Sequence, residues 1–200
     1  SGNQTRQWIR CFRLGLWEYL RSNRDMGRYQ KNVRFEWNLA QVPKDLSTLP
    51  PKHEIKIQLQ PDTELTWEGI QRSFLNEKAW MIGLEAHLDQ LRRRIFPEGK
   101  PLEKMDFFVL QHGSRVVGCS AVLALEGEGP QLLSGIVMDY EYQRRGLGVT
   151  LLQRCLLHLA EKGLEKASVI TREGVPAARY LYPKFGGRAT VLEPAPVPAT

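Results

Sequence analysis

The chain has 200 residues, of which 42% are hydrophobic and 25% charged, and it carries a formal net charge of +6. This composition is ordinary for a globular protein, and the longest apolar stretch, 116–125, is too short to span a bilayer, so we expect no membrane partner. The basic balance does not favour nucleic-acid binding, because the arginines are spread along predicted helices and do not form one block.

Residues 1–52 are predicted to form an N-terminal arm. Apolar residues near helical spacing predict a helix over 4–30, period-two alternation predicts a strand or edge segment over 33–39, and two prolines mark 46–52 as a linker. Three of the five tryptophans precede residue 40. An arm this aromatic is not expected to be disordered, so it should pack on the main domain or on a second copy in a homodimer.

The main domain is predicted to span residues 53–193, with a Pro/Ala tail over 194–200. Its element order, β-α-α-β-β-β-α-β-α-β, is typical of an α+β fold with a mixed sheet. The expected strands lie at 54–60, 105–111, 116–125, 131–138, 166–171 and 189–192, and the expected helices at 66–77, 80–95, 148–163 and 176–184.

The strongest motif is the turn Gln143-Arg144-Arg145-Gly146-Leu147-Gly148, which follows a predicted strand and opens a predicted helix. This layout directs several backbone N–H groups and the positive end of a helix dipole toward one point. The two glycines lack a Cβ, so a ligand can approach the backbone closely. The turn therefore predicts phosphate binding.

Three kinds of phosphate loop share the layout of a glycine turn before a helix. A dinucleotide fingerprint would need a third glycine where Leu151 stands, and no Gly-Lys-Ser/Thr run of a nucleotide-phosphate loop is present. The acyl-CoA pattern, Gln/Arg-x-x-Gly-x-Gly/Ala between a strand and a helix, fits at each position. The alternative is a tight turn whose glycines serve packing alone.

Two sequence blocks now carry a family resemblance. The first is Met138-Asp139-Tyr140-Glu141-Tyr142 with the turn that follows it, and the second runs from Val175 to Gly187 and contains Ala178 and Leu181-Tyr182-Pro183-Lys184. Together they resemble GNAT-type N-acetyltransferases, with the strongest likeness over 106–187 and an overall span of about 54–192. Tyr140, Val175 and Gly187 stand where that superfamily often has Pro, Asn and Phe.

The resemblance implies a GNAT-like mixed, largely antiparallel sheet with flanking helices, and an N-acetyltransferase that uses acetyl-CoA as acyl donor. It implies that the backbone N–H of Met138 stabilises the oxyanion and that Tyr182 gives a proton to the departing thiolate. An open strand edge at Ile136 to Met138 would hold the pantetheine arm. The predicted cofactor-binding residues are Ile136, Val137, Met138, Gln143, Arg144, Arg145, Gly146, Leu147, Gly148, Val149, Thr150 and Ala178.

The general base and the acceptor are less well defined by the sequence. Asp139 and Glu141 follow the strand closely and could act as bases through water, or could only solvate the loop. The acceptor is expected to be a primary amine of a small molecule or a protein, with walls from 62–104 and from the arm. The alternative function is a catalytically silent CoA-binding or interaction module.

The cysteines and histidines show no pattern of a disulfide framework or metal site. Cys11, Cys119 and Cys155 are odd in number and far apart, which indicates free thiols in a reducing compartment and hence a cytoplasmic protein. The four histidines show no ligand spacing with Cys, Asp or Glu. They are expected to face solvent or to lie in the core, and these residues are His53, His87, His112 and His158.

Overall fold

The structure is a computed structural model that describes residues 31–59, 61–75, 80, 83–101, 104–127 and 129–192. The helix predicted over 4–30 and the tail over 194–200 lie outside these residues. The strands are β1 (Asn32–Asn38), β2 (His53–Gln58), β3 (Met105–His112), β4 (Arg115–Leu123), β5 (Val137–Met138), β6 (Lys166–Arg172) and β7 (Arg188–Leu192). The α-helices are α2 (Thr63–Leu75), α3 (Leu84–Ile95) and α4 (Leu147–Glu161).

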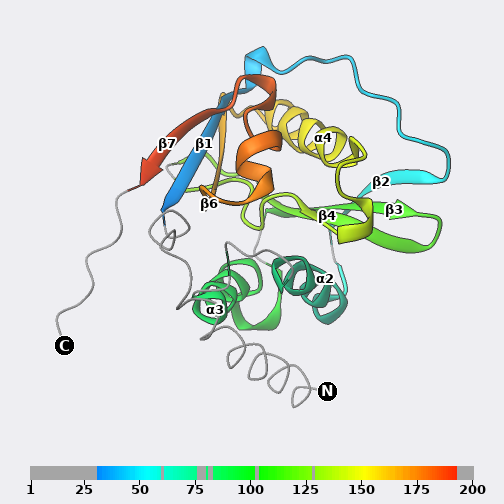
Figure 1. Cartoon of the computed structure of the whole chain (residues 1–200), viewed down its shortest axis with the longest axis vertical. Helices are drawn as coiled ribbons and strands as arrows, with labels where there is room; N and C mark the ends of the chain where they lie inside the picture. Colours follow the sequence, from blue (N-terminus) through cyan, green and yellow to red (C-terminus); the bar gives the residue numbers. More distant parts are fainter. Residues whose placement is uncertain are drawn as a thin grey trace, which may run out of the picture.

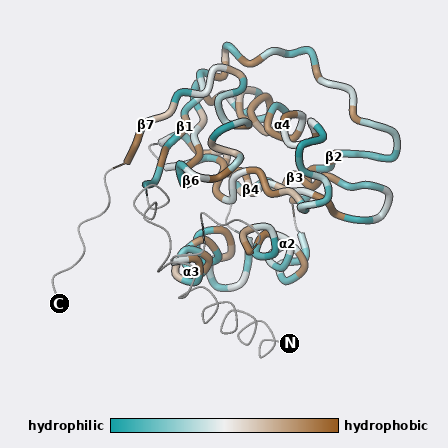
Figure 2. The backbone as a smooth tube through the Cα atoms, in the orientation of Figure 1, coloured by the Kyte–Doolittle hydropathy of each residue, from teal (hydrophilic) through white to brown (hydrophobic). Residues whose placement is uncertain are grey.

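A four-stranded antiparallel sheet, β2-β3-β4-β5, forms the middle layer of the molecule (Figure 1). Helices α2 and α3 cover one face and α4 covers the other. Neighbouring residues of β3 point to opposite faces, so Phe107 packs in the cluster under α2 and α3 while Phe108 packs in the cluster under α4. Figure 2 shows hydrophobic residues along β4 and α4, as expected for elements inside two cores.

A second sheet has the order β6-β1-β7, so the first of the described strands in the sequence lies between the last two. β1 pairs antiparallel with both neighbours. The strand predicted over 33–39 is therefore confirmed, but it is interior and not an edge. Val33, Phe35 and Trp37 are buried on one face of β1. This part of the predicted arm lies in the folded core, while the boundaries at 52 and 193 and the arm-mediated dimer stay predictions.

The strand predicted over 131–138 is interrupted. Leu132 forms an isolated bridge with Val122, and the regular strand β5 holds only Val137–Met138. Between them Gly135 takes a positive φ of 64°, and the Ser134 hydroxyl accepts a hydrogen bond from the Ala121 N–H at 2.9 Å. The Ser134 side chain thus replaces a backbone acceptor, and the residues between Leu132 and Val137 form a bulge.

Both helices that cover the first face start at a different residue from the one predicted. α2 starts at Thr63, ahead of the predicted 66, because the Asp62 carboxylate accepts a hydrogen bond from the Leu65 N–H at 2.9 Å. α3 starts at Leu84 and not at 80, after Gly83 in the left-handed region. Within the described part of the chain, none of the helices is both long and apolar enough to cross a membrane.

Candidate functional site

The two sheets meet at one end and separate at the other. The N–H groups of Gln131 and Leu132 both donate to the Ser168 carbonyl of β6, at 3.0 and 3.1 Å. Beyond this point no ladder joins β5 to β6 among the described strands. A cavity of about 240 Å³ lies in the gap, between the segment 133–138 on one side and β6 with the turn 175–182 on the other.

The open edge of β5 faces this gap. The Asp139 N–H donates to the Val117 carbonyl of β4 at 2.8 Å, so Asp139 belongs to a hydrogen-bonded pair. Because such pairs alternate along an antiparallel ladder, the next pair, Gly118 with Met138, is not hydrogen-bonded. The N–H of Met138 therefore points away from β4, toward the cavity that this residue lines.

The turn before α4 presents a run of backbone N–H groups. The Gln143 N–H donates to the Tyr140 carbonyl, and the N–H groups of Val149 and Thr150 donate to the Gly146 carbonyl at 3.1 and 3.2 Å. Within the described residues, five amides between these donors have no acceptor. These amides belong to Arg144, Arg145, Gly146, Leu147 and Gly148.

This turn is open enough for an anion to approach. Gly146 has a φ of 78°, and a Cβ placed on it would contact nothing within 4 Å. Arg144 lines the cavity, whereas the Arg145 guanidinium lies 5.4 Å from the centroid of the Tyr142 ring. A phosphate at this point would meet unpaired donors, a helix N-terminus and one arginine.

Tyr182 lines the cavity and is only 3% exposed. Its hydroxyl oxygen accepts a hydrogen bond from the Ile136 N–H at 3.0 Å, and no described group accepts the hydroxyl proton. Burial raises the pKa of Tyr182 to about 12, so the phenol stays protonated at neutral pH. Tyr180, two residues earlier, is 71% exposed and also lines the cavity.

The two predicted base candidates are turned away from the cavity. Asp139 Oδ2 lies 3.0 Å from Arg115 Nη2, and Glu141 Oε2 lies 3.4 Å from Arg115 Nη1. Neither carboxylate lines the cavity. The structure therefore does not bring them together with Tyr182, and their role as bases stays a prediction.

His87 on α3 lines the cavity and was not singled out by the sequence. Its ring stacks on Trp80 with centroids 4.0 Å apart and lies 5.3 Å from the Phe74 ring. Burial, and then the charges of Arg172 and Arg94, lower its pKa to about 4, so the imidazole is neutral at pH 7. A lone histidine on a helix carries no local signal of such a position.

The other predicted site residues divide into two groups. Most of them line the cavity, and the rest lie beside it. Those that line it are Ile136, Val137, Met138, Gln143, Arg144, Gly146, Gly148, Val149 and Tyr182. Those that do not are Arg145, Leu147, Thr150 and Ala178, of which the last three are buried. At the far end the lining comes from Ser73, Phe74, Trp80 and His87, inside the region 62–104, and from no described residue of 31–52.

Comparison with known proteins agrees with this geometry. Residues 103–186 match the model of the acetyltransferase (GNAT) domain. No curated protein sequence matches the chain. Among solved structures, a GCN5-related N-acetyltransferase from Ralstonia eutropha is 18% identical with a TM-score of 0.55, and the match covers 72% of this chain and 98% of that one.

Two further solved structures share the fold. A GCN5-related N-acetyltransferase from Sphaerobacter thermophilus is 18% identical with a TM-score of 0.52, over 80% of this chain and 49% of that one. A GCN5-related N-acetyltransferase from Kribbella flavida is 10% identical with a TM-score of 0.50, and the match covers 81% of this chain and 55% of that one. The chain thus spans about half the length of these two proteins. It has the fold of the GNAT N-acetyltransferases, and its residues 103–186 match the acetyltransferase domain of that superfamily.

Proposed function

We propose that the chain is a CoA-dependent N-acyltransferase that transfers acetyl from acetyl-CoA to a primary amine of a small molecule or protein by direct attack. The observation that carries this proposal is the continuity of three features in one cavity. Unpaired amides lie at the mouth of α4, the open edge of β5 runs beside them, and Tyr182 also lines the cavity.

Each feature suits one part of acetyl-CoA. The unpaired amides between Arg144 and Gly148, with the α4 dipole, would hold the pyrophosphate. The edge of β5 would pair with the amides of the pantetheine arm, as a strand pairs with a neighbour. The thioester would then lie near Met138 and Tyr182, two buried residues that line the cavity.

The chemistry follows from these positions. The amine nitrogen attacks the thioester carbonyl, a C–N bond forms, and the carbonyl oxygen becomes an oxyanion that accepts a hydrogen bond from the Met138 N–H. The C–S bond then breaks, and the thiolate takes the proton of Tyr182, which burial keeps protonated. The amine loses its extra proton to solvent, and bulk solvent reprotonates Tyr182.

Much of the rate would come from holding the two reactants together. Effective molarities of ~10⁵ M or more are reached when reacting groups are well oriented. The part of the cavity lined by Phe74, Trp80 and His87 is then left for the acceptor.

We place the enzyme in the cytoplasm, since Cys119 and Cys155, the two described cysteines, are free and buried.

Calorimetry with acetyl-CoA tests the proposal directly. Gly146→Glu places a carboxylate beside the expected pyrophosphate and should weaken binding at least about tenfold through like-charge repulsion. Gly163→Glu is the matched control, because Gly163 has a φ of 91° with open space around it but lies beyond the opposite end of α4. Absence of binding at millimolar ligand, or equal affinity in the two variants, would overturn the CoA site.

A screen of mixed amines for free-thiol release tests the transfer step. Release of CoA with one class of amine supports the transferase. Tight acetyl-CoA binding without turnover on any amine would instead favour a silent interaction module, which the orientation of Asp139 and Glu141 away from the cavity would then explain.

A further inference from the structure

We propose that Trp37 is a positioning residue for Tyr182. Strand β1 would then support the acyltransfer site through a side chain that does not itself line the cavity. This inference rests on the proposed function, in which Tyr182 protonates the leaving thiolate. Neither Trp37 nor Phe35 lines the cavity. Both act through their contacts with the tyrosine and with the backbone that follows it.

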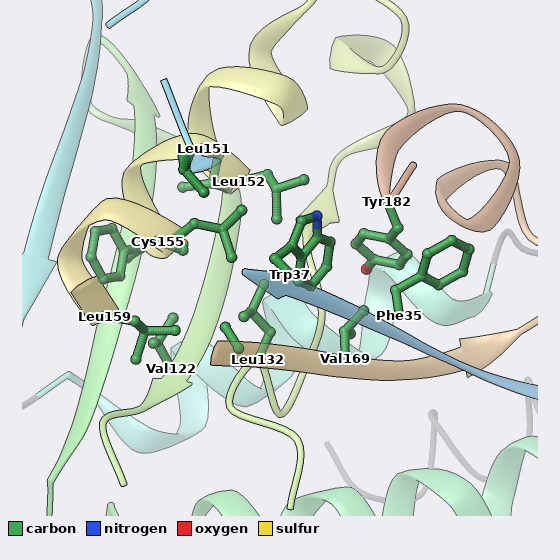
Figure 3. Close-up of a cluster of buried hydrophobic side chains, with 14 of the residues drawn as sticks. Phe35, Trp37, Val122, Leu132, Leu151, Leu152, Cys155, Leu159, Val169 and Tyr182 are labelled. Atoms are coloured by element: carbon green, nitrogen blue, oxygen red, sulfur yellow. The ribbon is translucent and has the colours of Figure 1, made fainter. Parts of the chain in front are cut away.

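The contacts are specific and come from one face of β1. The Trp37 ring meets the Tyr182 ring edge-on, with centroids 5.9 Å apart, and the Phe35 ring lies 5.6 Å away on a tilted plane. Figure 3 shows both side chains reaching from β1 toward the tyrosine. Ring pairs at these distances have preferred orientations, so they restrict the side chain of Tyr182.

A hydrogen bond fixes the backbone that carries the tyrosine. Trp37 Nε1 donates to the Lys184 carbonyl at 2.9 Å, two residues after Tyr182. The indole itself is fully buried and locked in the sheet, because β1 pairs with β6 and β7 on its two sides. The indole thus holds the tyrosine ring and the following turn with a single rigid side chain.

The opposite side of Tyr182 is held by the other sheet. Its hydroxyl oxygen accepts from the Ile136 N–H, so the ring bridges from β1 to the bulge ahead of β5. Gly135 leaves the space for this approach, since a Cβ there would lie 2.5 Å from the hydroxyl oxygen. With both ends held, the remaining direction open to the phenol proton is the cavity.

The first test needs no enzymatic activity. Trp37→Phe removes the indole N–H and keeps an aromatic ring, and the readout is hydrogen exchange of the Ile136 amide in the full chain. We expect exchange to rise roughly threefold to tenfold, the effect of one weakened neutral hydrogen bond. Trp67→Phe is the control, because Trp67 is also buried, at 5% exposure, but packs in the cluster under α2 and α3. The proposal would be overturned if the Ile136 amide exchanged as slowly in Trp37→Phe as in the wild type, with the free energy of unfolding of Trp37→Phe equal to that of Trp67→Phe.

The second test uses turnover and a double-mutant cycle. Trp37→Phe should lower kcat and leave the KM for acetyl-CoA unchanged, and it should lower kcat no further in a Tyr182→Phe background. A merely structural tryptophan would lower kcat by the same factor in both backgrounds, and that result would contradict positioning. If Trp37→Phe does not fold, Phe35→Leu takes its place in both tests.

The two tests separate the possible failures. If no amine supports turnover, the proposed function fails, and the exchange of Ile136 still decides whether Trp37 positions Tyr182. If Tyr182→Phe turns over as fast as the wild type, the proton-donor role fails, and the exchange result again decides the positioning alone.

Discussion

The amide nitrogen of Ile136 lies 3.0 Å from the hydroxyl oxygen of Tyr182, and this hydrogen bond crosses the gap between the two sheets. Because the tyrosine is the acceptor, its own proton is left for a group in the cavity. The protein therefore presents a protonated phenol beside the open edge of β5 without any rearrangement.

Tyr182→Phe should lower kcat by ~10²–10⁴-fold, the usual effect of losing a positioned acid. The affinity for acetyl-CoA, measured by calorimetry, should change little because the pyrophosphate site is elsewhere. The free energy of unfolding should fall by about 1 kcal/mol, since the partly buried Ile136 N–H loses its acceptor. Tyr140→Phe, at an exposed position that does not line the cavity, should leave all three quantities at wild-type values.

Asp139→Asn and Glu141→Gln should each leave kcat close to that of the wild type at saturating amine. Both carboxylates contact Arg115 and neither lines the cavity, so their loss removes no group from the reacting atoms. Steady-state kinetics across the pH range checks this. A large fall in kcat for either variant, with loss of the acidic limb of the pH profile, would instead restore that residue as the general base.

Gly135→Ala should reduce both stability and kcat. The new Cβ would lie 2.5 Å from the Tyr182 hydroxyl oxygen, so the tyrosine has to move, and the positive φ adds about 1–2 kcal/mol. Gly113→Ala isolates the backbone contribution, because Gly113 has a nearly equal φ and no atom within 4 Å of an added Cβ. Denaturant unfolding and kcat should show a larger loss for Gly135→Ala. Equal losses would mean that the tyrosine adapts freely.

His87 should make the protein less stable in acid. Its pKa is lowered from 6.5 to about 4 in the fold, so between these values the unfolded chain binds a proton that the folded chain does not. The contribution of the neutral His87 to the free energy of unfolding is fully present above pH 6.5 and is lost as the pH falls toward 4. His87→Phe keeps the ring against Trp80 and removes this titration. The Tm of the wild type should therefore fall further than that of His87→Phe on acidification, and parallel curves would contradict the burial of a neutral imidazole.

The fold could be predicted from local patterns where those patterns are complete. The hairpin of β3 and β4 and the helix α4 follow from apolar runs, a glycine turn and helical spacing, and they lie close to the predicted ranges. The turn before α4 was predictable for the same reason: its glycines and arginines are consecutive in the sequence.

Other features depend on distant residues and leave no local trace. The interior place of β1 depends on pairing with Arg172 and Leu192, both far along the chain. The break at Ser134 arises because a side-chain hydroxyl replaces a ladder acceptor. Tertiary packing likewise sets two contacts of the site, the ion pair of Asp139 with Arg115 and the stacking of His87 on Trp80.

The order β6-β1-β7 also constrains how the protein is made. Asn32 is synthesised well before its two partners, Arg172 and Leu192. Contacts between residues so far apart in sequence form slowly, because a long loop has to close first. During synthesis, β1 therefore has both edges unpaired and its aromatic face exposed until β6 and β7 emerge, while the hairpin of β3 and β4 can already form. We expect the nascent chain to be most prone to aggregation in that interval.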